Sequence, residues 1–495
     1  MKKFIAIMLI TVICLCFMLA CAADTASDSP ETATAERNGT NEEIAEPGEI
    51  PRILPNLPEN AYFDGFTFTV LSHRETGGYN WYQEEPREII SEEETGAPIN
   101  DAVFRRNETL RERHGFELAL VAVTDEVGAL RRAVSAGDDI YDAVMIYNHF
   151  VPGAVQAGIL VEVGQLPFVD RSQPWWDDAV DGMSVLGRNF LLAGDMLILD
   201  NEATNALVFN KDMMRDLGHH FPYESVKQGT WTFDALESLI RDAAVDLDGD
   251  GRMTENDQWG LVTFNDTLHA FLVGGGGLLA EKDDRDVPFI NFASEQNIRI
   301  AERAMDFLFE TSFTYNVQRE GWTISPYRIF QENRALFMWV RLRVIETLRG
   351  MEADFGILPI PKFDEHQPEY RSVVNPYTGV LLAVPLTASD LERTSIILEA
   401  VSAESRYTLQ PAYYDIVLQR QFARDVESEA MLDIIFSTRV YDIGAIYGFG
   451  NNVFINYIEL ASTLSRGIAT MYERRSAAFQ RDIDRLVQRI EDMDF

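Results

Sequence analysis

Twelve residues, from Asp246 to Asp257, have the composition and spacing of a calcium-binding loop. In such a loop carboxylates occupy positions 1, 3 and 5, a glycine at position 6 makes a sharp turn, and a carboxylate stands at position 12. Calcium binds six to eight oxygen atoms, which this pattern can supply. We predict a structural Ca²⁺ site with ligands from Asp246, Asp248, Asp250, Asp257 and the backbone carbonyl of Arg252. The alternative is an acidic turn that binds no ion.

Aromatic residues next to polar ones form the second group that could do chemistry. A sugar has apolar C–H faces and a polar rim, so its site pairs flat rings with hydrogen-bonding side chains. Trp339 follows an apolar stretch and precedes Arg341, while Asn375 and Tyr377 lie in a stretch typical of a loop. These residues are candidate sugar contacts, although an aromatic residue at a strand end is as common in a protein core.

The adjacent Trp175 and Trp176, followed by two aspartates, could also hold a saccharide. Paired indoles more often fix a loop to the core, and we favour that interpretation. The four glycines at 274–277 lack the Lys-Ser/Thr ending of a phosphate-binding loop. Flexible backbone is the better explanation for this run.

Motifs of common enzymes are missing from the sequence. It contains no H-E-x-x-H and no G-x-S-x-G, and its three cysteines all lie within the first 21 residues, which excludes a thiol nucleophile in the body of the chain. We therefore expect a protein that is not an enzyme. With 79 acidic residues, a carboxylate pair acting on a glycoside is the alternative, and sequence alone cannot place two carboxylates at the required separation.

The N-terminus has the pattern of an exported, lipid-anchored protein. Lys2 and Lys3 precede an apolar run that reaches Ala20, as in a signal peptide. Small residues before Cys21 resemble the lipobox of bacterial lipoproteins, so residues 1–21 are predicted to be a lipoprotein signal with lipidation at Cys21. Ordinary secretion with cleavage near residue 23 is the alternative. Residues 22–58 are polar and poor in aromatics, which indicates a flexible linker.

The remaining chain has a globular composition and a strongly acidic balance. The formal net charge of the whole chain is −37, which repels nucleic acid and anionic lipid heads. We expect no nucleic-acid partner, contact with the membrane through the lipid anchor only, and a monomer.

Strand and helix patterns alternate after the linker. Residues 66–70 alternate apolar and polar side chains, a helix is expected from Asn100 to Arg113, and strands follow at 116–121 and 141–146 with a helix at 126–136 between them. This order predicts an α/β fold with a doubly wound sheet. Ligands bind at the carboxyl ends of such strands, where residues 147–149 lie. At the C-terminus, apolar residues recur at helical spacing between 479 and 490.

Several segments resemble extracellular solute-binding proteins of the maltose-binding type. The segment 142–149 followed by 156–160 is similar to part of their first lobe, and Glu202 with 207–212 is similar to a hinge strand and the start of their second lobe. Further similarities occur in the family's order, at 229–233, 335–338 and 355–361. Together they extend over essentially all of residues 60–495.

The resemblance implies a two-lobed, type II periplasmic-binding-protein-like fold with hinge crossings and a cleft between the lobes. Its boundaries would be residues 60–198 and 360–405 for lobe 1 and residues 208–350 and 406–495 for lobe 2, with hinges near 199–207 and 351–359. By resemblance, and from their chemistry, the substrate-binding residues are Tyr147, Asn148, His149, Glu202, Trp339, Arg341, Asn375 and Tyr377.

The function implied is capture of a small solute, expected to be a sugar or oligosaccharide, for the permease of an ABC transporter. The protein would act on the extracellular face of the cell membrane. Alternatives are an extracellular carbohydrate-active enzyme and a surface module for adhesion or sensing.

Overall fold

The computed structural model describes residues 52–74, 86–322, 327–348, 350–418 and 426–493. The signal peptide, Cys21 and most of the linker lie outside these residues. The chain divides into two units, Met1–Ile53 and Leu54–Phe495, and the fold belongs to the second unit. Among the described helices, none combines the length and the apolar character needed to cross a bilayer.

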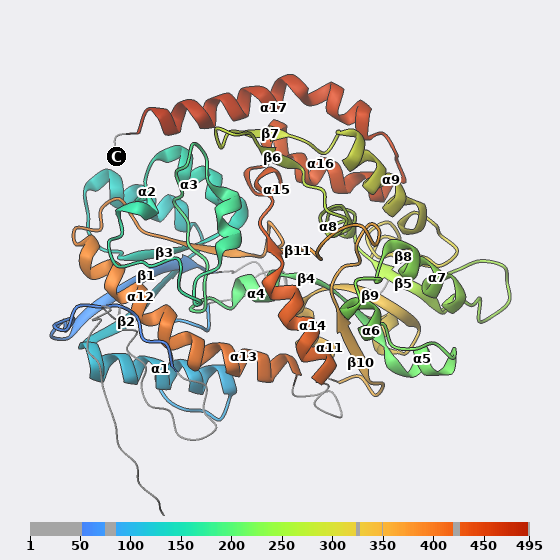
Figure 1. Cartoon of the computed structure of the whole chain (residues 1–495), viewed down its shortest axis with the longest axis horizontal. Helices are drawn as coiled ribbons and strands as arrows, with labels where there is room; N and C mark the ends of the chain where they lie inside the picture. The colour runs from blue at the N-terminus through green and yellow to red at the C-terminus, as the bar shows by residue number, and fades with distance from the viewer. Residues whose placement is uncertain (1–51, 75–85, 323–326, 349, 419–425, 494–495) are drawn as a thin grey trace, which may run out of the picture. The chain divides into compact units, whose positions relative to one another are not determined.

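The first sheet has four strands in the order β12-β3-β1-β2 (Figure 1). Strand β1 is parallel to β2 and β3, whereas β12 is antiparallel to β3. Helix α1 connects β1 to β2, and α2 connects β2 to β3, as the alternating pattern predicts. The bounds are β1 Phe66–His73, α1 Pro98–His114, β2 Phe116–Val123, α2 Glu126–Ala136, β3 Ala143–Tyr147 and β12 Val380–Ala383.

Local signals account for the ends of these helices. Both α1 and α2 stop at glycines in the left-handed conformation, Gly115 and Gly137, which end helices without a steric penalty. Helix α1 begins two residues earlier than the sequence predicted, because Pro98 suits the first turn of a helix. Asn100 is therefore not the cap, and its side-chain amide donates instead to the carbonyl of Glu93.

The second sheet has five strands in the order β10-β4-β9-β5-β8. Strand β4 is antiparallel to both of its neighbours, and β5 is parallel to both of its neighbours. All six residues of β4 are buried, so this strand is central to the core. The bounds are β4 Asn205–Asn210, β5 Trp259–Thr263, β8 Thr314–Asn316, β9 Ala335–Arg341 and β10 Phe355–Leu358.

Shorter strands and the helices complete the body of the chain. Helix α8, which follows β5, is buried along its whole length. The remaining short strands are β6 Ala280–Lys282, β7 Pro288–Ile290, β11 Ser372–Val373 and β13 Arg439–Val440. The further helices up to residue 348 are α3 Val151–Ala157, α4 Leu199–Ala203, α5 Lys211–Asp216, α6 Tyr223–Lys227, α7 Phe233–Ala243, α8 Thr267–Gly274, α9 Glu295–Leu308, α10 Arg328–Gln331 and α11 Ile345–Leu348.

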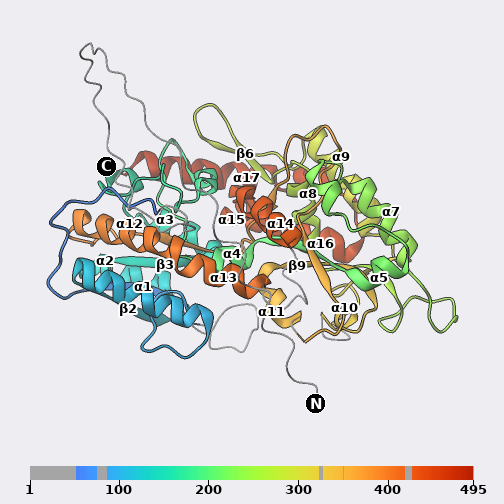
Figure 2. The same ribbon diagram turned by 60° about the horizontal axis from the view of Figure 1, so that its bottom comes forward.

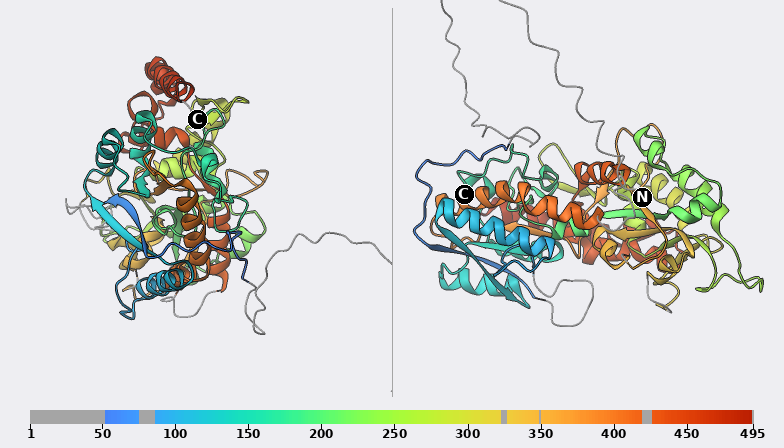
Figure 3. Two further views of the ribbon diagram at one scale, coloured as in Figure 1. Left: turned by 90° about the vertical axis from the view of Figure 1, so that its left-hand side faces the viewer. Right: turned by 90° about the horizontal axis from the view of Figure 1, so that it is seen from below.

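Segments from the second half of the sequence return to the first sheet. Strand β12 completes that sheet, and helices α12 (Leu391–Tyr407) and α13 (Leu409–Leu418) pack against α1, as Figures 2 and 3 show. Helix α14 (Val426–Ser437) packs against β10 of the second sheet. The lobe boundaries, including the one predicted at 405/406, stay predictions.

The last helices form a further layer. Helix α16 (Phe449–Thr463) follows the short α15 (Ile443–Tyr447) and packs against α8 and against α17 (Ile468–Glu491). The apolar stripe expected near the C-terminus is buried, with Phe479, Ile483, Leu486 and Ile490 pointing inward. Near its end α17 reaches α3, where the Arg489 guanidinium donates to the carbonyls of residues 156 and 157 at 2.9 and 3.0 Å.

The paired tryptophans fix a loop to the core, as their sequence context favoured. Both indoles are buried, and their N–H groups donate to the two carboxylate oxygens of Glu399 on α12 at 3.1 Å (Trp175) and 2.7 Å (Trp176). The backbone N–H of Asp170 donates to the same carboxylate. Burial raises the pKa of Glu399 and these hydrogen bonds lower it; the effect of burial is larger, so the pKa is about 7.

Candidate functional site

A pocket of about 310 Å³ lies where the end of β9, the loop between β11 and β12, and helix α16 meet. This volume is at the small end of the ~300–1,000 Å³ range of ligand pockets. Four of the eight predicted substrate-binding residues line it together, which are Trp339, Arg341, Asn375 and Tyr377. The rest of the lining consists of Phe264, Asp266, Gln318, Tyr327, Val340, Val344, Thr378, Phe454, Ile455 and Ile458.

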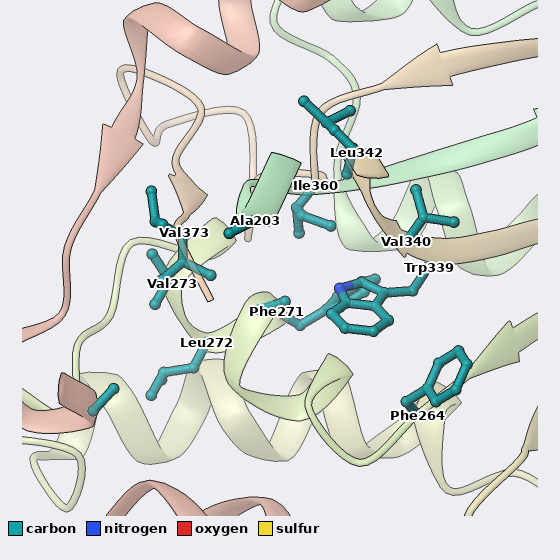
Figure 4. Close-up of a cluster of buried hydrophobic side chains, with 14 of the residues drawn as sticks. Ala203, Phe264, Phe271, Leu272, Val273, Trp339, Val340, Leu342, Ile360 and Val373 are labelled. Atoms are coloured by element: carbon teal, nitrogen blue, oxygen red, sulfur yellow. The ribbon is translucent and has the colours of Figure 1, made fainter. Parts of the chain in front are cut away.

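Trp339 contributes to this pocket from the buried strand β9. Only 3% of its surface is exposed, and its ring centroid lies 5.6 Å from that of Phe264. Figure 4 shows both rings among buried apolar side chains. No hydrogen-bond partner for the indole Nε1 is found among the described residues. Trp339 thus belongs to the core and also forms part of the pocket wall.

Asn375 organises the loop on the opposite side of the pocket. Its side-chain oxygen accepts hydrogen bonds from the backbone N–H groups of Tyr377 and Thr378 at 2.9 and 3.2 Å. Its amide group donates to Asp266 Oδ2 at 3.0 Å. These bonds occupy both ends of a fully buried amide. Asn375 therefore holds the loop against α8 and the turn that precedes it.

Tyr377 is held by contacts on several sides. Its ring stacks on that of His149, with centroids 4.8 Å apart and planes inclined by 19°, and lies 5.7 Å from Phe454. The Asn452 amide donates to its hydroxyl at 2.7 Å. Burial raises the pKa of Tyr377, and burial followed by the nearby His73 lowers the pKa of His149 to about 4. Both rings are therefore neutral near pH 7, so they stack without a charge.

The three candidates at the end of β3 lie next to the pocket. Tyr147 is buried and meets His73 edge to face, with centroids 5.3 Å apart. Asn148 is completely buried, its backbone N–H donates to the carbonyl of Gly379 at 2.9 Å, and its amide has no partner among the described residues. His149 touches a lining residue through its ring contact with Tyr377. Binding roles for the three stay predictions.

Glu202 lies outside this lining, in the short helix α4 that leads into β4. It is buried and accepts a hydrogen bond from Arg87, which also donates to Glu346 on α11 at 2.8 Å. Burial raises the pKa of Glu202, while the guanidinium of Arg87 opposes that shift. In this structure Glu202 therefore connects α4 to α11 through Arg87, and its contact with a solute stays a prediction.

The acidic loop brings together three of its four predicted carboxylates. Ligand oxygens of Asp246, Asp248 and Asp250 lie within 4.8 Å of one another. The closing Asp257 is not in this group, because its oxygens accept from the backbone N–H groups of Leu247 and Thr254 at 2.9 and 2.7 Å. Burial alone would raise the pKa of Asp257, but these hydrogen bonds lower it.

The side chain at the closing position explains this difference. Aspartate is one methylene shorter than the glutamate that usually closes such a loop, and here it accepts hydrogen bonds from the backbone of Leu247 and Thr254 instead. Arg252 contributes a backbone N–H to Asp250 at 2.7 Å, and the role of its carbonyl stays a prediction. Three converging carboxylates, of which Asp246 is half-buried and the other two are exposed, fit a hard cation, while the rest of its shell would have to come from water or backbone.

Part of the pocket was missed by sequence reasoning. Asp266, Tyr327 and the α16 residues enter it through tertiary contacts between segments far apart in the chain. One signal was present in the sequence at 448–452, Gly-Phe-Gly-Asn-Asn. Glycine and asparagine are the residues that most readily adopt positive φ, so this run favours an irregular turn at the start of a helix.

No family model matches the chain, and no curated protein matches it. Solved structures do match it. The sugar-binding protein MalE from Xanthomonas citri has a TM-score of 0.56 at 11% identity over 86% of this chain and all of its own. An ABC substrate-binding protein from Listeria monocytogenes in complex with cycloalternan has a TM-score of 0.53 at 10% identity, over 86% of this chain and all of its own. An ABC transporter solute-binding protein from Thermotoga lettingae bound with α-D-tagatose has 0.51 at 15% over 85% of this chain and all of its own.

The chain has the fold of these proteins. It is the two-lobed, type II periplasmic-binding-protein fold, which confirms the predicted fold class. The match extends over 86% of the chain for the MalE structure. At identities of 10–15% the comparison establishes the fold alone.

Proposed function

We propose that this protein captures a small saccharide outside the cell and delivers it unchanged to an ABC importer. The observation that carries the proposal is the pocket at Trp339 and Tyr377, in which rings stand beside hydrogen-bonding side chains, in a chain with the fold of sugar-binding proteins. Solved structures of this fold hold cycloalternan and α-D-tagatose, which supports a saccharide as the ligand class.

The proposed mechanism is ligand-stabilised closure. His149 comes from the end of the first sheet and stacks on Tyr377, whereas Trp339 comes from the second sheet, so a solute in the pocket contacts residues positioned by both sheets. A ligand shifts an equilibrium between open and closed states by its difference in affinity for the two. The closed form is the one recognised by the permease, and no bond of the solute is broken.

Calorimetric titration of the purified protein with a panel of mono- and oligosaccharides tests this proposal, together with melting temperatures and chromatography of the recovered sugar. A ligand that binds only the native state raises the melting temperature, because it stabilises that state by RT ln(1 + [L]/Kd). Binding with the sugar recovered intact is the expected result. Shortened products would instead identify a carbohydrate-active enzyme, and no binding by any saccharide would leave adhesion or sensing as the function.

We also propose a lipid anchor at Cys21, with residues 22–58 as the tether and the folded unit on the extracellular face as a monomer. Two acyl chains on one cysteine give stable anchoring. Labelling of cells with radioactive palmitate should mark the wild-type protein and not the Cys21→Ser variant. Equal labelling of the two proteins would contradict the anchor.

For the acidic loop we propose a structural calcium ion bound by Asp246, Asp248 and Asp250. At about 10 mM Ca²⁺ and a Kd of ~10⁻⁴–10⁻³ M, bound calcium stabilises the fold by about 1.4–2.7 kcal/mol. The melting temperature should therefore rise with Ca²⁺ and fall with chelator, and Asp248→Asn should abolish the difference.

The matched control for this loop is Asp283→Asn. Asp283 stands in another exposed turn, where its carboxylate also accepts backbone N–H bonds from residues 285 and 287. This variant should keep the calcium response. Equal melting temperatures of the wild-type protein with and without calcium would contradict the site.

A further inference from the structure

Helix α16 contains a left-handed turn in its first residues. Gly450, Asn451 and Asn452 have φ/ψ angles of 66/43°, 61/55° and 67/77°. For residues other than glycine this conformation costs roughly 1–2 kcal/mol each, although asparagine tolerates it better than most. Such backbone persists only when its surroundings hold it in place.

Helix α17 supplies those surroundings. The backbone N–H of Gly450 donates to Asp482 at 2.8 Å, and Arg475 donates to the Gly450 carbonyl at 3.2 Å. A Cβ atom at Gly450 would lie 2.1 Å from the Phe479 ring, so only glycine fits there. The turn is therefore fixed from the side of α17, away from Tyr377.

The turn places the Asn452 amide between the helix and Tyr377. Its oxygen accepts from the backbone N–H of Ile455 at 3.0 Å, which caps the regular part of α16. Its nitrogen donates to the Tyr377 hydroxyl at 2.7 Å. Because the backbone N–H can only donate, it fixes which end of the amide is the oxygen, so the end that faces Tyr377 is the NH₂ group.

This orientation determines what the phenol can do. An amide NH₂ group only donates, so the Tyr377 oxygen is the acceptor in this bond and its own proton is not used in it. The ring cannot easily turn away, because it stacks on His149 and its backbone N–H is bonded to Asn375. The phenol stays protonated at neutral pH, and Tyr377 lines the pocket.

We propose that the Tyr377 hydroxyl is a dedicated hydrogen-bond donor to the bound solute and that Asn452 is the positioning residue that keeps it a donor. The solute must then present an acceptor oxygen, either a hydroxyl, a ring oxygen or a glycosidic oxygen, to Tyr377. This inference rests on the proposed function, because it names the specificity of the same pocket.

The decisive substitution is Asn452→Asp. Aspartate caps helices well and tolerates positive φ, so the bond to Ile455 N–H is kept. Its second oxygen is an acceptor and takes the phenol proton, which reverses the polarity of the bond to Tyr377. Affinity for the best-binding sugar among maltotriose, raffinose and tagatose should fall about 3- to 10-fold, as expected for one net hydrogen bond.

Tyr377→Phe should cause a similar loss by removing the donor itself. In a protein that already carries Tyr377→Phe, adding Asn452→Asp should change the affinity by less than about 2-fold, because the phenol through which it acts is gone. The matched control is Asn451→Asp, which adds the same charge to the exposed neighbouring residue of the same turn. Its affinity, and the melting temperatures of Asn452→Asp and Asn451→Asp without sugar, should stay at wild-type values.

The outcomes separate this inference from the function on which it rests. If the wild-type protein binds neither these three sugars nor any other saccharide of the calorimetric panel, the proposed function fails and this inference with it; if another saccharide of the panel binds, the variants are measured with that sugar. If the wild-type protein binds and Tyr377→Phe binds equally well, the donor role is overturned while the function stands. Additive losses in the double variant, or the same loss in Asn451→Asp, would overturn the positioning role of Asn452.

Discussion

Glu399 offers a quantitative test of the structure, through the pH dependence of stability. Its carboxylate is 1% exposed and accepts hydrogen bonds from Trp175 and Trp176, yet burial raises its pKa from 4.5 to about 7. Because the native state binds this proton more tightly than the unfolded state, the contribution of Glu399 is fully present below pH ~4.5. It is lost as the pH rises through about 7.

The magnitude follows from the two pKa values. Linkage between pKa values of 4.5 and about 7 gives a loss of about 2.5 kcal/mol in the free energy of unfolding between pH ~5 and pH ~8. Glu399→Gln does not titrate. Its NH₂ group cannot accept a hydrogen bond from the N–H that it faces, which lowers the stability of the variant by an amount that does not depend on pH. We expect the variant to gain about 2.5 kcal/mol relative to the wild type over this range.

Urea unfolding of both proteins across this pH range, followed by tryptophan fluorescence, measures the difference directly. Other buried carboxyls also have raised pKa values, about 7 for both Glu88 and Asp200. Their contributions are common to both proteins and cancel in the comparison. Parallel stability curves for the two proteins would refute the buried placement of Glu399, and a variant that loses stability relative to the wild type as the pH rises would refute the sign.

Two further substitutions test the packing around the pocket and the second sheet. Trp339→Ala should lower the free energy of unfolding without ligand by about 3–5 kcal/mol, because removal of a buried indole leaves a cavity. A loss below about 1 kcal/mol in urea unfolding would contradict this. Gly260→Ala should lower the melting temperature severely, because its Cβ would lie 1.9 Å from the Ile240 carbonyl oxygen. Its control, Gly153→Ala in α3, meets no atom closer than 3.9 Å and should leave the melting temperature unchanged or higher. Equal behaviour of the two alanine variants would show that β5 does not lie against α7 as described.

The fold could be predicted because its signals are local. Strands were predicted at residues 66–70 and 141–146, and the structure has them at Phe66–His73 and Ala143–Tyr147. Gly115 and Gly137 end the helices between them. The period of two also places side chains of β1 and β3 on two faces. Val70 and Met145 enter one apolar cluster, whereas Leu71 and Ile146 enter the other.

The site was predicted only in part, because it depends on partners that are distant in sequence. Trp339 and Tyr377 line one pocket, while their contact with a solute stays a prediction. Glu202 instead bonds Arg87, whose position no pattern near Glu202 indicates. The role of Asn452 could not be predicted from the sequence, because it depends on a left-handed turn that helix α17 holds in place. Asp257 matched a ligand position by type and spacing, but its bonds to local backbone could not be read from spacing alone.

The position of β12 has a consequence for biosynthesis. Strand β3 is complete early in translation, but its partner of residues 380–383 follows the whole of the second sheet in the sequence. Until that segment emerges, β3 exposes an apolar edge with unpaired backbone groups, which invites aggregation. Truncated chains that end before residue 380 should therefore depend on chaperones to stay in solution.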